Sequence, residues 1–200
     1  MEVTNFKKKG NIITFTVKAA DAAVINALRR VVISEVPVMA IEEVTFLDNT
    51  SALNDEMLAH RLGFVPLKTD LVNYALPGQK TKGKGKALEK ATFTLEVSGP
   101  GPIHASDLVP ADPEIAPVYP TTLINKLGAG QHVKLEATAR LGTGREHIKW
   151  QPGIMAFEQK QEGRIDAIVE SFGQLPVEEM LMHAFSVLNE KMEVLSEKLT

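Results

Sequence analysis

The chain of 200 residues contains no cysteine. This absence excludes disulfide bonds, thiolate zinc sites and cysteine-held iron–sulfur clusters for these residues. No apolar run of 18 residues occurs, and the N-terminus lacks the apolar core of a signal peptide. We therefore expect a cytoplasmic protein that does not contact a membrane.

Aromatic residues are scarce, at 6% of the chain with a single tryptophan, and charge of either sign is not in large excess. The formal net charge is -3, so no overall basic field exists to recruit nucleic acid. A hydrophobic share of 44% is ordinary for a soluble globular chain. Two hundred residues are enough to bury one large core or two small ones.

Residue patterns for catalysis or metal binding are also missing. Adjacent carboxylates at Glu42-Glu43 and Glu178-Glu179 point in different directions in a strand or helix, so they do not form an acid–base pair. Gly142-Thr143-Gly144-Arg145 lacks the further residues of a dinucleotide or phosphate loop, and we interpret it as a tight turn. None of the five histidines has metal-ligand spacing, namely His60, His104, His132, His147 and His183.

What the sequence does contain is a mixture of helical and strand periodicity. Alternating apolar residues predict strands, and apolar residues at steps of three and four predict helices. The expected strands are 2–18 (a hairpin), 39–47, 64–67, 91–97, 123–127, 133–141, 154–157 and 164–171. The expected helices are 22–36, a short one from about 55 to 62, and 177–199.

The helix expected at 22–36 begins at the N-cap Asp21 and is stopped by Pro37. Its apolar stripe contains Ile25, Leu28 and Val32 and is wide, which favours packing on a sheet and on something else.

The same helix carries two adjacent arginines, Arg29 and Arg30. Two neighbouring guanidinium groups on a largely apolar helix do not both reach water easily. We expect at least one of them to form an ion pair, either inside the chain or across an interface.

The last helix would be about 35 Å long at about 1.5 Å per residue. Its apolar stripe contains Leu181, Phe185, Leu188, Met192 and Leu195. Such a helix is either a core helix or part of an interface. Its length, together with the wide stripe of 22–36, favours a helical interface with a second chain.

Two further segments leave alternatives open. Trp150 follows the polar residues Glu146, His147 and Lys149, which indicates either contact with a partner or a tryptophan packed at a domain boundary. The lysine-rich loop of 80–90 is either a solvated loop or a phosphate contact. The second reading supports an alternative function as a nucleic-acid-binding module.

A set of segments spread along the chain is distinctive: Asn26–Arg30, Glu35–Pro37, Ala40–Glu42, Asn49–Ser51, Asp55–Glu56, Leu58–Gly63, Val65–Leu67, Gly142–Pro152 and Leu175–Glu179. Together these segments resemble the alpha-like subunits of cellular RNA polymerases, most closely in their archaeal form, the equivalent of the third subunit of eukaryotic polymerase II. The resemblance covers nearly the whole chain and is weakest across 72–120.

The resemblance implies a two-part α+β fold. Residues 1–46 and 154–200 would form a dimerisation domain with a sheet and two long helices, and 47–153 an inserted, mostly β domain. The dimer-interface residues would be Ile25, Leu28, Val32, Leu181, Phe185, Leu188, Met192 and Leu195.

The implied partner is the small alpha-like subunit L, giving a heterodimer. With the small subunits N and P, this heterodimer would form the platform for the large catalytic subunits, which hold the catalytic residues. The chain would then be an assembly subunit that meets DNA only indirectly. Contacts with the large subunits would come from Arg29, Arg30, Glu146, His147, Lys149 and Trp150.

The chain departs from the family pattern at two places. Many members carry zinc-binding cysteines in the loop corresponding to 78–90, where this chain has lysine and glycine. Many archaeal members also insert a cysteine-rich ferredoxin-like domain where this chain has only Glu158–Gly163. We therefore expect no cofactor: neither zinc nor an iron–sulfur cluster is carried over.

Overall fold

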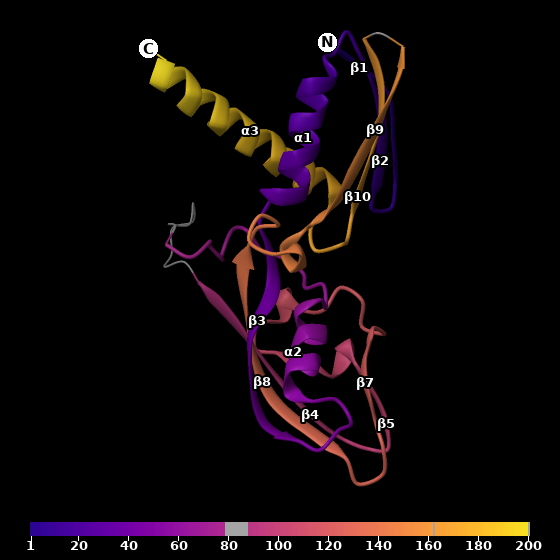
Figure 1. The fold of residues 1–200 in the computed structure, drawn as a ribbon, viewed down its shortest axis with the longest axis vertical. Helices are drawn as coiled ribbons and strands as arrows, with labels where there is room; N and C mark the ends of the chain where they lie inside the picture. Colours follow the sequence, from indigo (N-terminus) through magenta and orange to yellow (C-terminus); the bar gives the residue numbers. More distant parts are fainter. Residues whose placement is uncertain (79–87, 162, 200) are drawn as a thin grey trace. The chain divides into compact units, whose positions relative to one another are not determined.

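The computed structural model describes residues 1–78, 88–161 and 163–199. The chain is an α+β protein, as predicted (Figure 1). It divides into two compact units. One, the terminal unit, consists of Met1–Pro37 and Thr143–Thr200, and the other, the inserted unit, of Val38–Gly142.

The terminal unit is a four-stranded antiparallel sheet with α-helices on one face (Figure 1). The strand order is β1-β2-β10-β9. Its elements are β1 (Glu2–Lys9), β2 (Ile12–Lys18), α1 (Ala22–Ser34), the 3₁₀ helix η3 (Ile148–Trp150), β9 (Gly153–Gln161), β10 (Arg164–Ser171) and α3 (Val177–Leu199). Both ends of the chain therefore build one sheet, in which β10 pairs with β2.

Side chains on this sheet alternate between the two faces because the side-chain period of a strand is two. Ile13, Val17, Ile165 and Val169 are buried. Ile168, one position from Val169, is 43% exposed on the opposite face. One face therefore forms the core under α1, and the other is open.

Helix α1 begins and ends close to where the sequence places it. The Asp21 Oδ1 accepts a hydrogen bond from the Ala23 backbone N–H at 2.8 Å, which confirms Asp21 as the N-cap. The helix ends at Ser34, and the Glu35 N–H donates to the Val31 carbonyl at 2.9 Å. Val36 is not helical, since Pro37 disfavours helical backbone in the residue before it.

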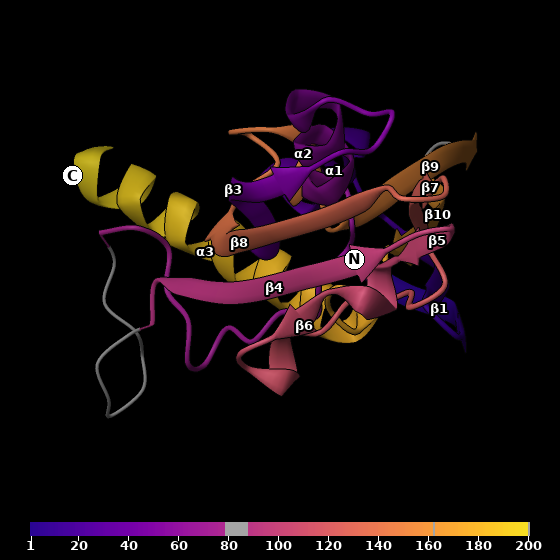
Figure 2. The same ribbon diagram turned by 90° about the horizontal axis from the view of Figure 1, so that it is seen from below.

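The inserted unit is mostly β (Figure 2). A four-stranded sheet has the order β3-β8-β4-β6, and β5 and β7 form a two-stranded sheet. The elements are β3 (Val38–Asn49), α2 (Asp55–Gly63), β4 (Lys90–Ser98), β5 (Gly101–His104), η1 (Ala105–Asp107), β6 (Val109–Pro110), η2 (Pro113–Ile115), β7 (Leu123–Leu127) and β8 (His132–Gly142). The segment 103–121 contains short strands and 3₁₀ turns.

The core of this unit lies between α2 and one face of the larger sheet. Leu58 and Leu62 of α2 are buried in the same cluster as Phe93 and Leu95 of β4. On the opposite face, Lys90 Nζ lies 3.1 Å from Glu43 Oε2, and other cross-strand charges pair in the same way. That face therefore carries cross-strand ion pairs that are in contact with water, and each pair contributes little to the stability of the protein.

The boundaries between the two units differ from those expected from the sequence, which lay between residues 46 and 47 and between residues 153 and 154. Strand β3 pairs with β8 from Val38↔Gly142 to Asn49↔Val133, so the whole of β3 belongs to the inserted sheet. The boundaries of the inserted unit accordingly fall after Pro37 and after Gly142.

Most of the lysine-rich loop of 80–90 lies outside the described residues. Four of its lysines, Lys80, Lys82, Lys84 and Lys86, lie outside the described residues. Lys90 is described and belongs to β4, where it pairs with Glu43.

Tyr74 connects two loops of the inserted unit. Its buried hydroxyl donates a hydrogen bond to Asp112 Oδ2 at 2.8 Å, while Asp112 Oδ1 accepts from the Glu114 N–H and caps η2. Burial raises the pKa of Tyr74, and the hydrogen bond to Asp112 and the charges of Asp112 and Asp70 raise it further. The neutral phenol is therefore the form that the folded state prefers.

We predict that Phe93→Ala destabilises the inserted unit by about 3–5 kcal/mol, because it removes a 1% exposed ring from the core and leaves a cavity. Thr94→Ala, the next residue along β4 and exposed, is the matched control and should cost less than about 1 kcal/mol. Urea unfolding followed by circular dichroism measures both. Equal loss of stability in the two variants would contradict this placement of the core.

We predict a loss of stability in alkali that depends on Tyr74. An unfolded tyrosine ionises near pH 10, whereas the pKa of folded Tyr74 is higher. The contribution of neutral Tyr74 to the free energy of unfolding is fully present below about pH 10 and is lost as the pH rises toward the pKa of the folded state. Tyr74→Phe should cost about 1 kcal/mol at neutral pH, because Asp112 loses a donor, and should make the alkaline decline shallower.

The control for this prediction is Tyr119→Phe, at the other tyrosine of the chain, which is 45% exposed. Urea titrations at neutral pH and above pH 10 should leave this variant like the parent. An unchanged alkaline slope in Tyr74→Phe would show that Tyr74 does not carry the effect.

Candidate functional site

Helix α3 is buried over its first half and exposed over its second. Val177, Met180, Leu181 and Ala184 are buried within the terminal unit. All described residues from 189 onward are exposed, and in Figure 1 this part of the helix extends away from the sheet. The apolar stripe nevertheless continues without interruption, with Phe185 44%, Met192 59%, Leu195 51% and Leu199 78% exposed.

Half of the residues expected at a dimer interface lie in the core of the chain itself. Ile25, Leu28, Val32 and Leu181 are at most 7% exposed. They pack inside the terminal unit, and their role at a dimer interface stays a prediction. Helical spacing identified a buried stripe but did not show whether this chain or another one covers it.

The other four residues remain accessible. Phe185, Met192 and Leu195 are exposed, and Leu188 is half-buried at the side of α3 that faces α1. The structure brings them together on one stripe, because positions three and four apart share a helix face.

The two arginines of α1 differ in their surroundings. The Nε–H and Nη2–H groups of Arg29 donate to Asn26 Oδ1, one turn earlier, at 3.1 and 3.0 Å. Arg30 is exposed, and among the described residues no carboxylate forms an ion pair with it. An ion pair inside the described chain, one of the two alternatives from the sequence, is thus present for neither residue.

Glu35, just after α1, is the acidic residue of this region. Its Oε1 lies 2.7 Å from Lys191 Nζ of α3 and 3.8 Å from Arg145 NH1. The Glu35 side chain is 23% exposed, so both cations surround a largely covered carboxylate. These pairs tie the end of α1 to α3 and to the loop that follows residue 142.

That loop is held tightly against α1. A Cβ added to Gly144 would lie 2.3 Å from the Ile33 carbonyl oxygen, so only glycine fits there, and the Arg145 N–H donates to the Ser34 carbonyl at 3.0 Å. Glu146 Oε1 accepts from the Thr143 N–H at 3.1 Å. This is the tight turn expected from the sequence, and its backbone caps the end of the helix.

The remaining residues of this loop divide into exposed and buried. Glu146 and His147 are exposed, and His147 Nδ1 accepts a hydrogen bond from the Lys149 N–H at 3.2 Å. Trp150 is only 2% exposed, with Lys149 Nζ 4.4 Å from its ring centroid. Trp150 is therefore packed inside the terminal unit, and its contact with a large subunit stays a prediction.

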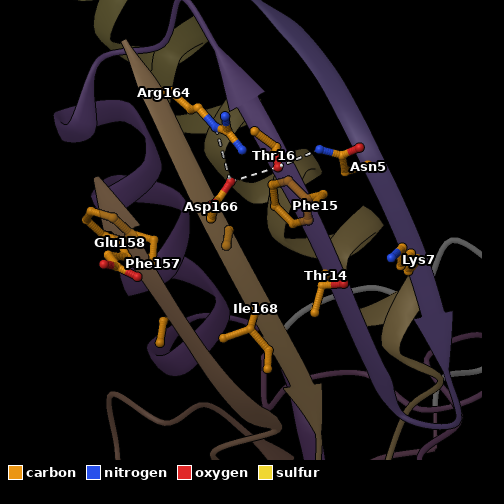
Figure 3. A pocket seen from close by; sticks show the side chains of 12 residues that line it. Asn5, Lys7, Thr14, Phe15, Thr16, Phe157, Glu158, Arg164, Asp166 and Ile168 are labelled. Atoms are coloured by element: carbon orange, nitrogen blue, oxygen red, sulfur yellow. Dashed lines mark hydrogen bonds and ion pairs between the residues drawn. The ribbon is translucent and has the colours of Figure 1, made fainter. Parts of the chain in front are cut away.

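A cavity with a volume of about 670 Å³ lies on the open face of the terminal sheet (Figure 3). Thr16 Oγ1 donates to Asp166 Oδ1 at 2.7 Å, and Asn5 Nδ2 donates to Thr16 Oγ1 at 3.4 Å. Arg164 Nε lies 3.8 Å from Asp166 Oδ1. The polar groups bind one another: the Asp166 carboxylate accepts a hydrogen bond from the Thr16 hydroxyl and lies beside the Arg164 guanidinium group.

Sequence reasoning missed this cavity because Asn5 reaches the sheet face only through a bulge in β1. The pairing of β1 with β2 shifts between Thr4 and Lys7, and Asn5 has a φ of 55°. The alternation of Arg164, Asp166 and Ile168 in β10 was the available signal for an open face.

Over the part of the chain that the structure describes, no three His, Cys, Asp or Glu side chains are grouped so as to hold a metal ion. No helix in the described ranges is both long and apolar enough to span a membrane. The functional candidates are therefore surfaces: the exposed stripe of α3 and the charged region around Arg30 and Glu35.

Comparison with known proteins gives a consistent result. The family model described as the RNA polymerase Rpb3/RpoA insert domain matches residues 40–158. The DNA-directed RNA polymerase subunit Rpo3 of Methanocaldococcus jannaschii is 40% identical over 171 residues, which cover 84% of this chain and 80% of that protein.

Two further relatives, also named DNA-directed RNA polymerase subunit Rpo3, are longer. That of Pyrococcus furiosus is 39% identical over 79% of this chain, and that of Pyrobaculum calidifontis 42% over 70%. The matches span 59% and 56% of these proteins, less than two thirds of their length. From the family match and these identities, the chain belongs to the alpha-like subunits of DNA-directed RNA polymerase, in the archaeal form called Rpo3.

Proposed function

We propose that this chain is a non-catalytic assembly subunit of a DNA-directed RNA polymerase, which pairs with a second alpha-like chain through the exposed stripe of α3. The observation that carries the proposal is the continuation of the apolar stripe beyond the chain's own core. Phe185, Met192 and Leu195 lie on it, each more than 40% exposed.

An exposed stripe of this kind favours association. Burying a large apolar side chain contributes about 1.5–3 kcal/mol, and several such side chains lie on one face of α3. Contiguous exposed apolar surface with polar neighbours marks an interaction site more often than a solvated surface. The opposite side of α3 carries Ser186, Glu190 and Glu193, which suits contact with water.

The partner that fits is a helix with an apolar stripe of its own, because a helix packs most closely against another helix through interdigitating side chains. By its family resemblance, this partner is the small alpha-like subunit L. The resulting heterodimer, with subunits N and P, forms a platform for the large catalytic subunits in the cytoplasm. DNA is met only through the assembled complex.

Catalysis belongs to the complex and not to this chain. Among the described residues, no three His, Cys, Asp or Glu side chains are grouped so as to hold a metal ion. Phosphoryl transfer to a nucleotide requires positioned metal ions and charge stabilisation. By the family resemblance, the large catalytic subunits supply them. The contribution of the chain is therefore to hold other subunits.

We predict that Phe185→Asp lowers co-purification with subunit L, after co-expression, by at least about tenfold. An aspartate there would bring an unpaired charge into an apolar interface, which is strongly unfavourable. The measurement is the ratio of the two subunits after affinity capture of this chain. Circular dichroism of the isolated variant checks that α3 is still formed.

Ser186→Asp is the matched control. It places the same charge one residue further on, turned by about 100° onto the polar face of α3. This variant should recover subunit L like the parent chain. If Phe185→Asp also recovers it fully, the stripe of α3 is not the pairing surface.

A further inference from the structure

The open face of the terminal sheet carries apolar side chains that remain accessible. Ile168 of β10, which lines the cavity of Figure 3, pairs across the sheet with Thr14 of β2 and Ala156 of β9. Because side chains alternate along a strand, Ile12 and Ile154 lie on the same face, two positions further along their strands. Ile168 is 43% and Ile154 44% exposed. We call Ile12, Ile154, Ala156 and Ile168 the open-face patch.

The polar groups on the other half of this face already have partners. Thr16 donates to Asp166 at 2.7 Å, and Asn5 donates to Thr16 at 3.4 Å. Arg164 lies 3.8 Å from the same carboxylate. A molecule that binds to this face therefore gains little from these groups, and the open-face patch is the surface that it would cover.

Three consecutive lysines of β1 divide between the two faces of the sheet. Lys8 pairs with Glu178 of α3, on the side of the helices. The register of β1 with β2 places Lys7 and Lys9 on the open face, at the edge of the open-face patch. Within the described part of the chain, neither Lys7 nor Lys9 forms an ion pair. The edge of the patch along β1 therefore carries two available positive charges.

The spacing of these two lysines matches one turn of a helix. Alternate residues of a strand are about 6.7 Å apart, and residues four apart in a helix are about 6 Å apart along its axis. On a helix that lies along the strands, two acidic residues at positions i and i+4 would each reach one lysine. Apolar residues on the neighbouring side of that helix would contact the open-face patch.

We propose that the open-face patch binds an amphipathic helix of a regulatory protein that associates reversibly with the assembled polymerase. Two acidic residues of this helix, four positions apart, pair with Lys7 and Lys9. A helix suits the patch better than an added strand, because the strands of the sheet already pair with one another and their face offers only side chains. This binding goes beyond the proposed function and uses a surface separate from the stripe of α3.

The open-face patch suits a reversible partner better than a permanent subunit. Permanent interfaces are large and strongly apolar, and they leave much apolar surface in water when they are empty. The open-face patch presents two isoleucines that are each less than half exposed, beside polar groups that already have partners. It is therefore stable in water without an occupant, as a surface for transient binding must be.

A nucleic-acid phosphate matches this face less well than an acidic helix does. Glu170 lies on the same face, between Ile12 and Ile154 in the register, and Glu158 pairs with Lys160 at 2.5 Å. These carboxylates repel a polyanion that spreads over the whole face. The acidic residues of a helix stay over β1, two strand spacings or about 9.6 Å from Glu170.

The first test uses a synthetic helical peptide and the polymerase assembled from all its subunits. The labelled peptide has about 18 residues, roughly 27 Å when helical, with leucines along one side and two glutamates four positions apart at its edge. Fluorescence anisotropy should show binding in the micromolar range. A peptide with lysines in place of the glutamates should bind at least about tenfold more weakly. Equal binding of the two peptides, or no binding of the first, would overturn the inference.

Variants of the chain test where the peptide binds. Ile168→Asp should lower the affinity at least about tenfold, because it brings an unpaired charge into apolar contact. Lys9→Gln should lower it about threefold, since one exposed ion pair is lost. Lys8→Gln, the same charge change on the other face of the sheet, is the matched control and should bind like the parent.

The control decides the outcome even if Ile168→Asp does not fold. Equal affinities in Lys9→Gln and Lys8→Gln would show that the lysines of the open face do not hold the peptide. All variants should recover subunit L as the parent chain does, because the stripe of α3 is unchanged. The α3 pairing is overturned by a different result, namely Phe185→Asp having no effect.

The second test identifies the natural occupant. A photo-reactive amino acid replaces Thr14, which is half-buried beside Ile168, in the assembled polymerase, and cell extract is added. Mass spectrometry should find a crosslinked peptide of a protein outside the polymerase, with two acidic residues four positions apart. Adding Lys9→Gln should lower the yield of this product. Crosslinks only to polymerase subunits or to nucleic acid, or a yield that Lys9→Gln does not change, would contradict the inference.

Discussion

The terminal unit depends on one constraint: the apolar stripe of α1 is too wide for a single neighbour to cover. One side of the stripe packs on the sheet through β9, and the other meets α3. Ile25, Leu28 and Val32 become fully buried only because both neighbours are present. Removing either would expose apolar surface and lose about 25 cal/mol for each Å² returned to water.

This double packing also determines the direction and placement of the functional surfaces. The end of α1 is fixed by the Gly144 turn and by the Glu35 carboxylate, which reaches Lys191 of α3. Helix α3 is therefore held along its first half, and its second half is presented to solvent. A rigid helix that carries its apolar face beyond the core loses little conformational entropy on binding a partner.

Local features of the fold followed from the sequence because they depend on a few neighbouring residues. Asp21 predicted the start of α1 through its cap, and the steps of three and four residues predicted α3 from its first residue to its last described one. Burial could not be predicted in the same way. Ile25 and Phe185 have equivalent patterns, yet one is 4% and the other 44% exposed, since the difference depends on how far the sheet extends.

The interactions around the two arginines of α1 were even harder to predict from the sequence than burial. The adjacent arginines were recognisable, but their different roles depend on Asn26 one turn earlier and on Lys191, which is distant in the chain. In the same way, the β1 bulge at Asn5 brings a polar side chain to a sheet face that alternation alone would not assign to it. Such contacts between distant segments exist only once the topology is fixed.

The hairpin of β9 and β10 has a consequence for how this family varies in length. Strand β9 ends at Gln161 and β10 resumes at Arg164, and these two residues are themselves the last pair of the ladder. Chain inserted between them would enter beyond the final hydrogen-bonded pair and leave the register of the whole sheet unchanged. Because loop closure costs only about 0.6 kcal/mol for each doubling of loop length, the tip can lose or accept an entire domain while the scaffold beneath it stays the same.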